Sequence, residues 1–217
     1  RANALDAPLK ETLAAAMVEL SYWNKDRILL DPFCGSGTIP IEAALIARNI
    51  APGLNRHFAS EKWERVPESL WKEERRKCYE AIDYDCMPEI YGSDIDPAAI
   101  ELAKANAELA GVDDCITFEV KPVQETELYG DYGCLITNPP YGERLGEVKD
   151  VENMYRSLGG TMHGNETWST YVITSMEYFE KLFGKKASAK RKLFNGRIKI
   201  DYYQFYGPRP PRKNEGE

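Results

Sequence analysis

The chain has 217 residues, of which 43% are hydrophobic, which is enough for one α/β domain with a full core. Its net charge of −7 by itself argues against a typical nucleic-acid-binding protein. No apolar run reaches the roughly 18 residues that a membrane-spanning helix needs. Five scattered cysteines without zinc spacing and only two histidines, His57 and His163, predict no metal site. We therefore expect a cytoplasmic protein with reduced thiols and with neither membrane nor metal partners.

Helices and strands alternate along most of the chain. The sequence predicts helices over residues 8–22, 38–49, 97–111, 150–159 and 176–184, and a highly charged helix over about 67–84. Short apolar runs predict strands over 27–31, 89–94, 115–120, 132–137, 170–175, 190–195 and 197–206. The Asn195-Gly196 pair between the last two strands is a strong hairpin signal. We predict a doubly wound, Rossmann-like α/β sheet that is mostly parallel, has helices on both faces and carries a C-terminal antiparallel hairpin strand.

The first strand leads into a glycine loop, LLDPFCGSGT over residues 29–38. Gly35 and Gly37 let backbone N–H groups approach a ligand without an obstructing Cβ. The loop matches neither GxGxxG nor the P-loop, and no lysine follows it, so ATP and GTP are not expected. Asp31 would repel a phosphate but suits an ammonium group. A ligand with an ammonium group, a carboxylate and a nucleoside is S-adenosylmethionine; the alternative is a tight strand-to-helix turn without a ligand.

The second strand ends in GSDID over residues 92–96. Asp94, at the strand end, can accept hydrogen bonds from two ribose hydroxyls. Asp96 precedes Pro97 and is expected to cap the next helix, with proline at its first position. A metal held by Asp94 and Asp96 is the alternative.

The third strand lacks the acid that would accept a hydrogen bond from an adenine amino group. Lys121 and Pro122 occupy the place where that acid is expected. Gln124, Glu125 or a backbone carbonyl would have to replace it.

The fourth strand is followed by NPPY over residues 138–141. Because proline has no N–H for the ladder, Pro139 and Pro140 end the strand and stiffen the loop. A base amino group is a poor nucleophile, since its lone pair is delocalised into the ring. Hydrogen bonds from that amino group to the Asn138 amide oxygen and the Pro139 carbonyl would localise the lone pair. Tyr141 offers a face for stacking a flipped-out base; the alternative is a strand stop with a core tyrosine.

Basic residues gather at the C-terminal end. Residues 181–217 contain eleven Lys and Arg against three acidic residues, a net charge of +8, which leaves −15 on residues 1–180. This segment is either a phosphate-facing patch or a solvated hairpin and tail. The aromatic residues of the hairpin are expected to form its core rather than a stacking platform: Tyr202, Tyr203, Phe205 and Tyr206.

The motifs together resemble a known family. DPFCGSGT, GSDID and NPPY, in this order, resemble class I S-adenosylmethionine-dependent methyltransferases that modify exocyclic amino groups. The longer strings DPFCGSGTIPIEAALIARNIAPGLNR, TNPPYGERLG and RKLFNGRIKIDYYQFYGPRPPR resemble the THUMP-domain-containing RNA guanine-N2 methyltransferases, in the branch that acts on 23S rRNA. The resemblance covers nearly the whole chain and departs from the family pattern at Pro122. It implies the class I methyltransferase fold, S-adenosylmethionine as cofactor, and residues 1–217 as a single catalytic domain.

The resemblance also implies roles for individual residues. Cofactor contacts are implied for Asp31, Phe33, Gly35, Ser36, Gly37, Thr38, Asp94, Ile95 and Asn138. Catalytic roles are implied for Asn138, Pro139, Pro140 and Tyr141. The leading helix, within residues 1–25, would pack beside the cofactor, where Lys10 or Thr12 would reach the cofactor carboxylate; simple helix capping is the alternative. Glu143 and Arg144 would orient the base or a phosphate, or form a surface ion pair.

The expected reaction is methylation of guanine N2 in large-subunit rRNA. The chain starts at Arg1 without an initiator methionine, so we expect a domain cut from a longer protein whose N-terminal THUMP region binds RNA together with the basic segment 181–217. Adenine N6 in DNA and a glutamine side chain present the same planar amino group, so both remain alternatives. A non-catalytic RNA-binding or cofactor-sensing module is the alternative outside enzymes.

Overall fold

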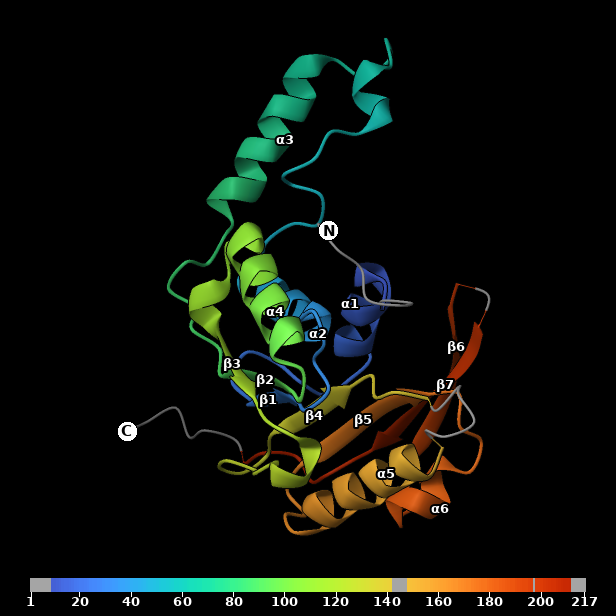
Figure 1. Ribbon diagram of the computed structural model, residues 1–217. Coiled ribbons are helices and arrows are strands. Elements are labelled where there is room, and N and C mark those ends of the chain that lie inside the picture. The colour runs from blue at the N-terminus through green and yellow to red at the C-terminus, as the bar shows by residue number, and fades with distance from the viewer. Residues whose placement is uncertain (1–8, 142–147, 197, 212–217) are drawn as a thin grey trace.

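The computed structural model describes residues 9–141, 148–196 and 198–211, which form one mixed sheet with helices on both faces (Figure 1). The seven strands lie in the order β3-β2-β1-β4-β5-β7-β6. Their bounds are β1 Leu29–Asp31, β2 Ile90–Asp94, β3 Ile116–Val120, β4 Cys134–Thr137, β5 Ser169–Thr174, β6 Ala189–Asn195 and β7 Ile198–Phe205. Strands β1 to β5 run parallel, and β7 lies antiparallel between β5 and β6. The strand order reverses between β1 and β4, which is where ligands bind in such sheets.

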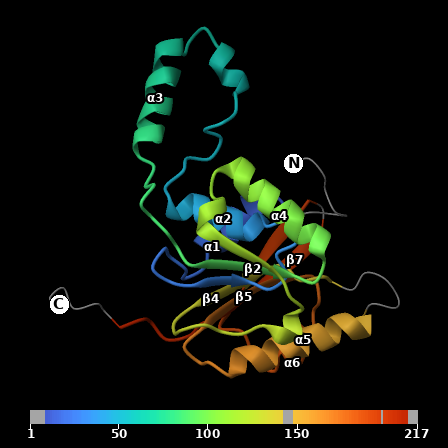
Figure 2. The same ribbon diagram turned by 60° about the vertical axis from the view of Figure 1, so that its left-hand side comes forward.

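The helices form two layers. One face of the sheet carries α1 (Glu11–Glu19), α2 (Thr38–Ala47) and α4 (Pro97–Ala110), and the other carries α5 (Val148–His163) and α6 (Phe179–Phe183) (Figures 1 and 2). Short 3₁₀ turns are η1 (Ala59–Lys62), η2 (Asp113–Cys115) and η3 (Val123–Glu125), and α3 (Glu68–Glu80) projects away from the sheet. The predicted doubly wound arrangement is therefore confirmed.

Two hydrophobic clusters, one on each face, hold these layers together. Strand β4 shows the alternation: Ile136 belongs to the cluster with α1 and α2, while Leu135 belongs to the cluster with α5 and α6. All four residues of β4 are buried, as expected for a central strand covered on both sides. The end of β4, where Asn138 follows, is therefore rigidly placed.

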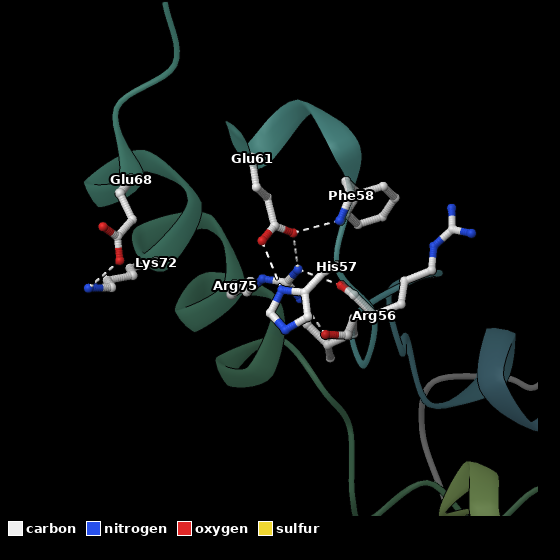
Figure 3. A network of polar contacts seen from close by, with 8 residues as sticks. Arg56, His57, Phe58, Glu61, Glu68, Lys72 and Arg75 are labelled. Atoms are coloured by element: carbon white, nitrogen blue, oxygen red, sulfur yellow. Dashed lines mark hydrogen bonds and ion pairs between the residues drawn. The ribbon is translucent and has the colours of Figure 1, made fainter. Parts of the chain in front are cut away.

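The segment between α2 and β2 forms an arm that extends away from the sheet (Figure 2). No residue of α3 is fully buried, but Trp71 of α3 stacks on Phe58 of the facing loop, with ring centroids 5.8 Å apart. Arg75 also reaches from α3 to this loop and donates to the Arg56 carbonyl and to the Glu61 carboxylate, both at 2.6 Å (Figure 3). A hydrogen bond with His57 also holds Glu61 and is the main cause that lowers the pKa of Glu61 to about 2. The arm is thus held by an aromatic contact and by charge-assisted hydrogen bonds.

The predicted elements are all present, with shifted ends. α5 is longer than expected and α6 is shorter. Gly196, with a φ of 64°, makes the predicted hairpin turn. The hairpin adds β7 antiparallel to β5, as predicted, and β6 pairs with β7 at the edge of the sheet. The buried side chains of Tyr202, Tyr203 and Phe205 confirm the hairpin core. Within the described ranges, no helix is long and apolar enough to cross a membrane.

Candidate active site

A cavity of about 410 Å³ lies at the carboxyl ends of β1, β2 and β4, beside the point where the strand order reverses. Most of the predicted site residues line it: Asp31, Phe33, Gly35, Ser36, Thr38, Asp94, Ile95, Asn138 and Pro140. Strand ends and the loops that follow them supply almost all of these, because parallel strands bring their carboxyl ends to one edge. Short motifs separated by more than a hundred residues therefore meet in one site.

Asp31, the last residue of β1, lies at the bottom of this cavity. Its side chain is only 1% exposed, and its Oδ1 accepts hydrogen bonds from the Thr137 hydroxyl at 2.6 Å and the Phe33 N–H at 3.2 Å. Burial raises the pKa of Asp31 to about 7, and the negative charge of Asp94 adds to this rise. A cationic ligand would stabilise the ionised form of this buried carboxylate, because the positive charge offsets the free-energy cost of ionising the group away from water.

Asp94 connects the end of β2 to the glycine loop. Its Oδ2 accepts from the Gly35 N–H at 3.0 Å, and its Oδ1 accepts from the Asp96 N–H at 3.0 Å. Each carboxylate oxygen keeps a further lone pair, so the group can still accept hydrogen bonds from two ligand hydroxyls. The neighbouring Ile95 is 68% exposed and lines the same cavity, which makes an apolar surface available to a flat ring.

Asp96 has the structural role that was predicted for it. Its carboxylate accepts from the Ala98 N–H at 2.9 Å and caps α4, with Pro97 at the first helical position. Asp96 does not line the cavity. Across the part of the chain that the structure describes, no group of three His, Cys, Asp or Glu side chains could hold a metal ion.

Gly37, for which a cofactor contact was expected, is not among the residues that line the cavity. It begins α2 with a φ of 80°, and a Cβ there would lie 3.0 Å from the side chains of Ala103 and Phe118. Gly37 thus allows α2 to pack against α4 and β3. Gly35, with a φ of 52°, has open space around the position of a Cβ and does line the cavity.

The segment after β3 supplies one wall of the cavity without an acid. Pro122, Val123 and Gln124 line it, whereas Glu125 does not. Of the predicted substitutes for the missing acid, Gln124 and the backbone carbonyls of this segment lie at the cavity, and the side-chain amide of Gln124 can both donate and accept.

Some apolar lining residues were not predicted from the sequence. Leu9 lines the cavity just before α1, while the neighbouring Lys10 and Thr12 are exposed and do not line it. Met154 reaches the cavity from α5. No sequence motif marks Leu9 or Met154, because each is an ordinary apolar residue of a helical segment.

The loop after β4 is held from several sides. The Tyr141 hydroxyl donates to the Asn138 amide oxygen at 2.6 Å, and the Tyr155 hydroxyl donates to the Pro140 carbonyl at 2.8 Å. Asn138 lines the cavity, whereas Pro139 is buried and, like Tyr141, is not among the lining residues. Tyr141 is half-buried against the cluster with α1 and α2. Glu143 and Arg144 lie outside the described residues.

The arrangement brings two chemical capacities together. The carboxylates of Asp31 and Asp94 and the open backbone at Gly35 suit a cationic nucleoside. The amide oxygen of Asn138, fixed at the wall of the same cavity, suits a planar amino group as hydrogen-bond donor. A group transfer from the first ligand to the second needs this proximity.

Comparisons with known proteins agree with this chemistry. The model of a family described as RMKL-like, methyltransferase domain, matches residues 1–204. The chain is 52% identical over 208 residues to YpsC of Bacillus subtilis (strain 168), whose name describes a candidate RNA methyltransferase. It is 41% identical over 208 residues to the ribosomal RNA large subunit methyltransferase K/L of Shewanella sediminis. These matches cover 95% and 93% of this chain but only 54% and 29% of the two relatives.

Solved structures give the same picture. SMU.472, a candidate methyltransferase solved in complex with SAH, aligns with a TM-score of 0.90 at 45% identity, over 95% of this chain and 55% of its own. A protein of Listeria monocytogenes, described as a predicted N6-adenine-specific DNA methylase, aligns with a TM-score of 0.89 at 48% identity, over 96% and 54% of the two chains. The chain therefore spans about half the length of these structural relatives.

Proposed function

This chain belongs to the RMKL-like methyltransferase domain family, and from this premise we propose that it methylates an exocyclic amino group of an RNA base, with S-adenosylmethionine as the methyl donor. The observation that carries the proposal is the position of Asn138, whose amide group lies in the wall of the cavity that Asp31 and Asp94 also line.

The cavity fits S-adenosylmethionine on three counts. The buried carboxylate of Asp31 can pair with the ammonium group of the methionine part. Asp94 can accept hydrogen bonds from the two ribose hydroxyls. Ile95 and Gln124 can lie against the adenine ring. The likeness to SMU.472, which was solved with SAH, supports the same assignment.

The residues of the NPPY loop would activate the amino group of the base. When bound, S-adenosylmethionine supplies a methyl group on a positively charged sulfur. Asn138 Oδ1, with one lone pair already taken by Tyr141, has a second lone pair for an amino hydrogen of the base. No donor among the described residues pairs with the Pro139 carbonyl. Although Pro139 does not line the cavity, its carbonyl is the second acceptor in this proposal. Because Tyr155 anchors the following carbonyl, both acceptors are in place before the base arrives.

Guanine N2 of large-subunit rRNA is the substrate that we propose. The name of the Shewanella relative, which refers to large-subunit rRNA, supports the choice of rRNA. The choice of guanine N2 rests on the sequence resemblance alone. Adenine N6 in DNA is the second candidate, and the description of the Listeria structure favours it. The acceptor geometry at Asn138 serves both, since each base presents a planar amino group.

Nucleoside mass spectrometry of rRNA, tRNA and DNA from cells that lack the full-length gene separates these candidates. Loss of N2-methylguanosine from large-subunit rRNA is the expected result. Loss of N6-methyladenine from DNA with unchanged RNA would assign the substrate to DNA. Restoration of the lost nucleoside by the wild-type gene, but not by a gene encoding Asn138→Ala, ties the loss to this site.

A further inference from the structure

The fold divides the basic C-terminal segment into two groups. β7 runs antiparallel to β5 and places Asp201 opposite Thr174, the last residue of β5. In the β6–β7 ladder the backbone of Lys192 lies opposite that of Asp201. Lys192 and Lys199 therefore lie at or beyond the carboxyl end of β5. Residues 185–186 precede β6 and lie at the opposite edge. The sequence alone shows one basic segment, but only its hairpin part shares an edge with the NPPY loop.

The tip of the β6–β7 hairpin lies at the same edge of the sheet as the NPPY loop. Thr137 pairs with Val172 of β5, so Asn138 stands level with the last residues of β5. β7 and β6 are the second and third strands away from β4, which at the usual strand spacing is about 10 and 15 Å. Figure 1 shows the hairpin rising past the end of β5 beside α1.

One side of the hairpin is anchored to the domain. Ile200 is 1% exposed, and Leu193, opposite it in the ladder, packs against the same cluster as α1. The Tyr202 hydroxyl donates to the Met17 carbonyl of α1 at 2.7 Å. These contacts fix the position of the side chains on the other face of the hairpin.

The other face combines positive charge with an aromatic ring. Phe194 is opposite Lys199 in the ladder, and Lys192 is two residues before Phe194, so the three side chains share one face. Phe194 is 65% exposed. Lys190 on this face is 3.3 Å from Asp201 and is neutralised by it. Lys192 and Lys199 form no ion pair with any residue that the structure describes, so their charges are available.

We propose that Lys192, Phe194 and Lys199 form a clamp for single-stranded RNA next to the target nucleotide, a proposal that rests on the proposed function. Unpaired cations bind phosphates, and an exposed ring stacks on any base. Single-stranded RNA is the fitting partner, because the target base must leave its stack to reach Asn138. The net charge of −15 on residues 1–180 disfavours phosphate binding over most of the rest of the domain. The RNA backbone would therefore bind at this face of the hairpin.

The test compares two double variants of the full-length protein. Binding of large-subunit rRNA, purified from cells that lack the gene, is measured by filter binding at several salt concentrations, and methyl transfer is measured in parallel. Lys192→Gln/Lys199→Gln should weaken binding about tenfold near 100 mM salt and reduce the slope of log Kd against log salt by about 1.4, the value for two single-strand phosphate contacts. Phe194→Ala should also weaken binding about tenfold, with little change in that slope.

Lys185→Gln/Lys186→Gln is the matched control, because it removes the same charge from the same segment at the other edge. It should leave Kd and slope near wild type, and none of these variants should change the affinity for S-adenosylhomocysteine. An unchanged Kd and slope in the hairpin variant, or an equal loss in the control, overturns the clamp. Absence of methyl transfer by the wild-type protein would overturn the proposed function instead, while the binding comparison would still decide on the clamp.

Discussion

The hydroxyl of Tyr141 and the amide oxygen of Asn138 are 2.6 Å apart and form a hydrogen bond within the NPPY loop. This bond fixes the orientation of the amide, because only the oxygen can accept from a hydroxyl. The oxygen then faces its second donor in one defined geometry. Tyr141 is half-buried against the core, so its ring is partly used for packing. We therefore propose that Tyr141 positions Asn138, while the stacking role expected from the sequence stays a prediction.

Two substitutions at Tyr141 separate positioning from stacking. Tyr141→Phe keeps the ring and removes the hydrogen bond, so we expect kcat to fall about fivefold to tenfold, the worth of one neutral hydrogen bond, with little change in KM for RNA. Tyr141→Ala removes ring and hydroxyl and should lower kcat further. Steady-state kinetics with both substrates varied gives the answer. If Tyr141→Phe keeps the wild-type kcat and Tyr141→Ala raises the KM for RNA, then Tyr141 stacks on the base and does not position Asn138.

Asn138→Ala removes the acceptor itself. We expect methyl transfer to fall by at least about tenfold, because the lost contact is made most strongly as the amino nitrogen reacts. Affinity for S-adenosylhomocysteine, measured by calorimetry, should remain within about twofold of wild type. Transfer at the wild-type rate would sink the acceptor-loop mechanism.

Site residues at strand ends could be predicted from the sequence, because short motifs carried the signal. Asp31 and Asp94 end recognisable strands and Asn138 follows one, and parallel strands bring such residues to one edge. Leu9 and Met154 could not be found in this way, since their place in the cavity depends on how α1 and α5 pack.

Glycine signals were ambiguous for a physical reason. A backbone close to a ligand and two helices in close contact both require the absence of a Cβ. Gly35 lines the cavity and has open space at the position of a Cβ, whereas a Cβ at Gly37 would lie against Ala103 and Phe118. The two glycines look alike in the sequence, and only their surroundings in the fold distinguish them. The basic segment 181–217 could not be assigned to one edge of the sheet from the sequence. Which of its lysines lie at the carboxyl end of β5 depends on the register of β6 and β7.

Asp94 and Asp96 form a matched pair for testing the cofactor site. Asp94→Ala removes the acceptor of the Gly35 N–H and the proposed ribose contact, so affinity for S-adenosylhomocysteine should fall at least about tenfold. Asp96→Ala removes the cap of α4 and should lower the free energy of unfolding by about 1 kcal/mol while leaving that affinity unchanged. Calorimetric titration and urea unfolding of both variants make the comparison. A change in turnover alone at Asp94→Ala would show that the ribose assignment is wrong.

We expect the ionisation of Asp31 to have opposite effects on two quantities as the pH rises: the stability of the ligand-free protein and its affinity for the cofactor. Burial raises the pKa of Asp31 to about 7, against a usual value of 3.8. Between these two values the folded chain holds a proton that the unfolded chain has released. The stabilisation from this proton is complete below pH 3.8 and is lost as the pH rises through 7. Cofactor binding has the opposite preference, since only the ionised carboxylate pairs with an ammonium group.

Asp31→Asn tests this account, because an amide oxygen can still accept from Thr137 and Phe33. At pH 8 the empty variant should be more stable than wild type by on the order of 2 kcal/mol, and this difference should shrink towards pH 5. Wild-type affinity for S-adenosylmethionine should rise from pH 6 to pH 8, whereas the variant should bind more weakly and with a flatter pH profile. Urea unfolding and equilibrium dialysis across this range measure both quantities. Equal, pH-independent affinity in the two proteins would remove Asp31 from the ammonium site and leave it a buried structural acid.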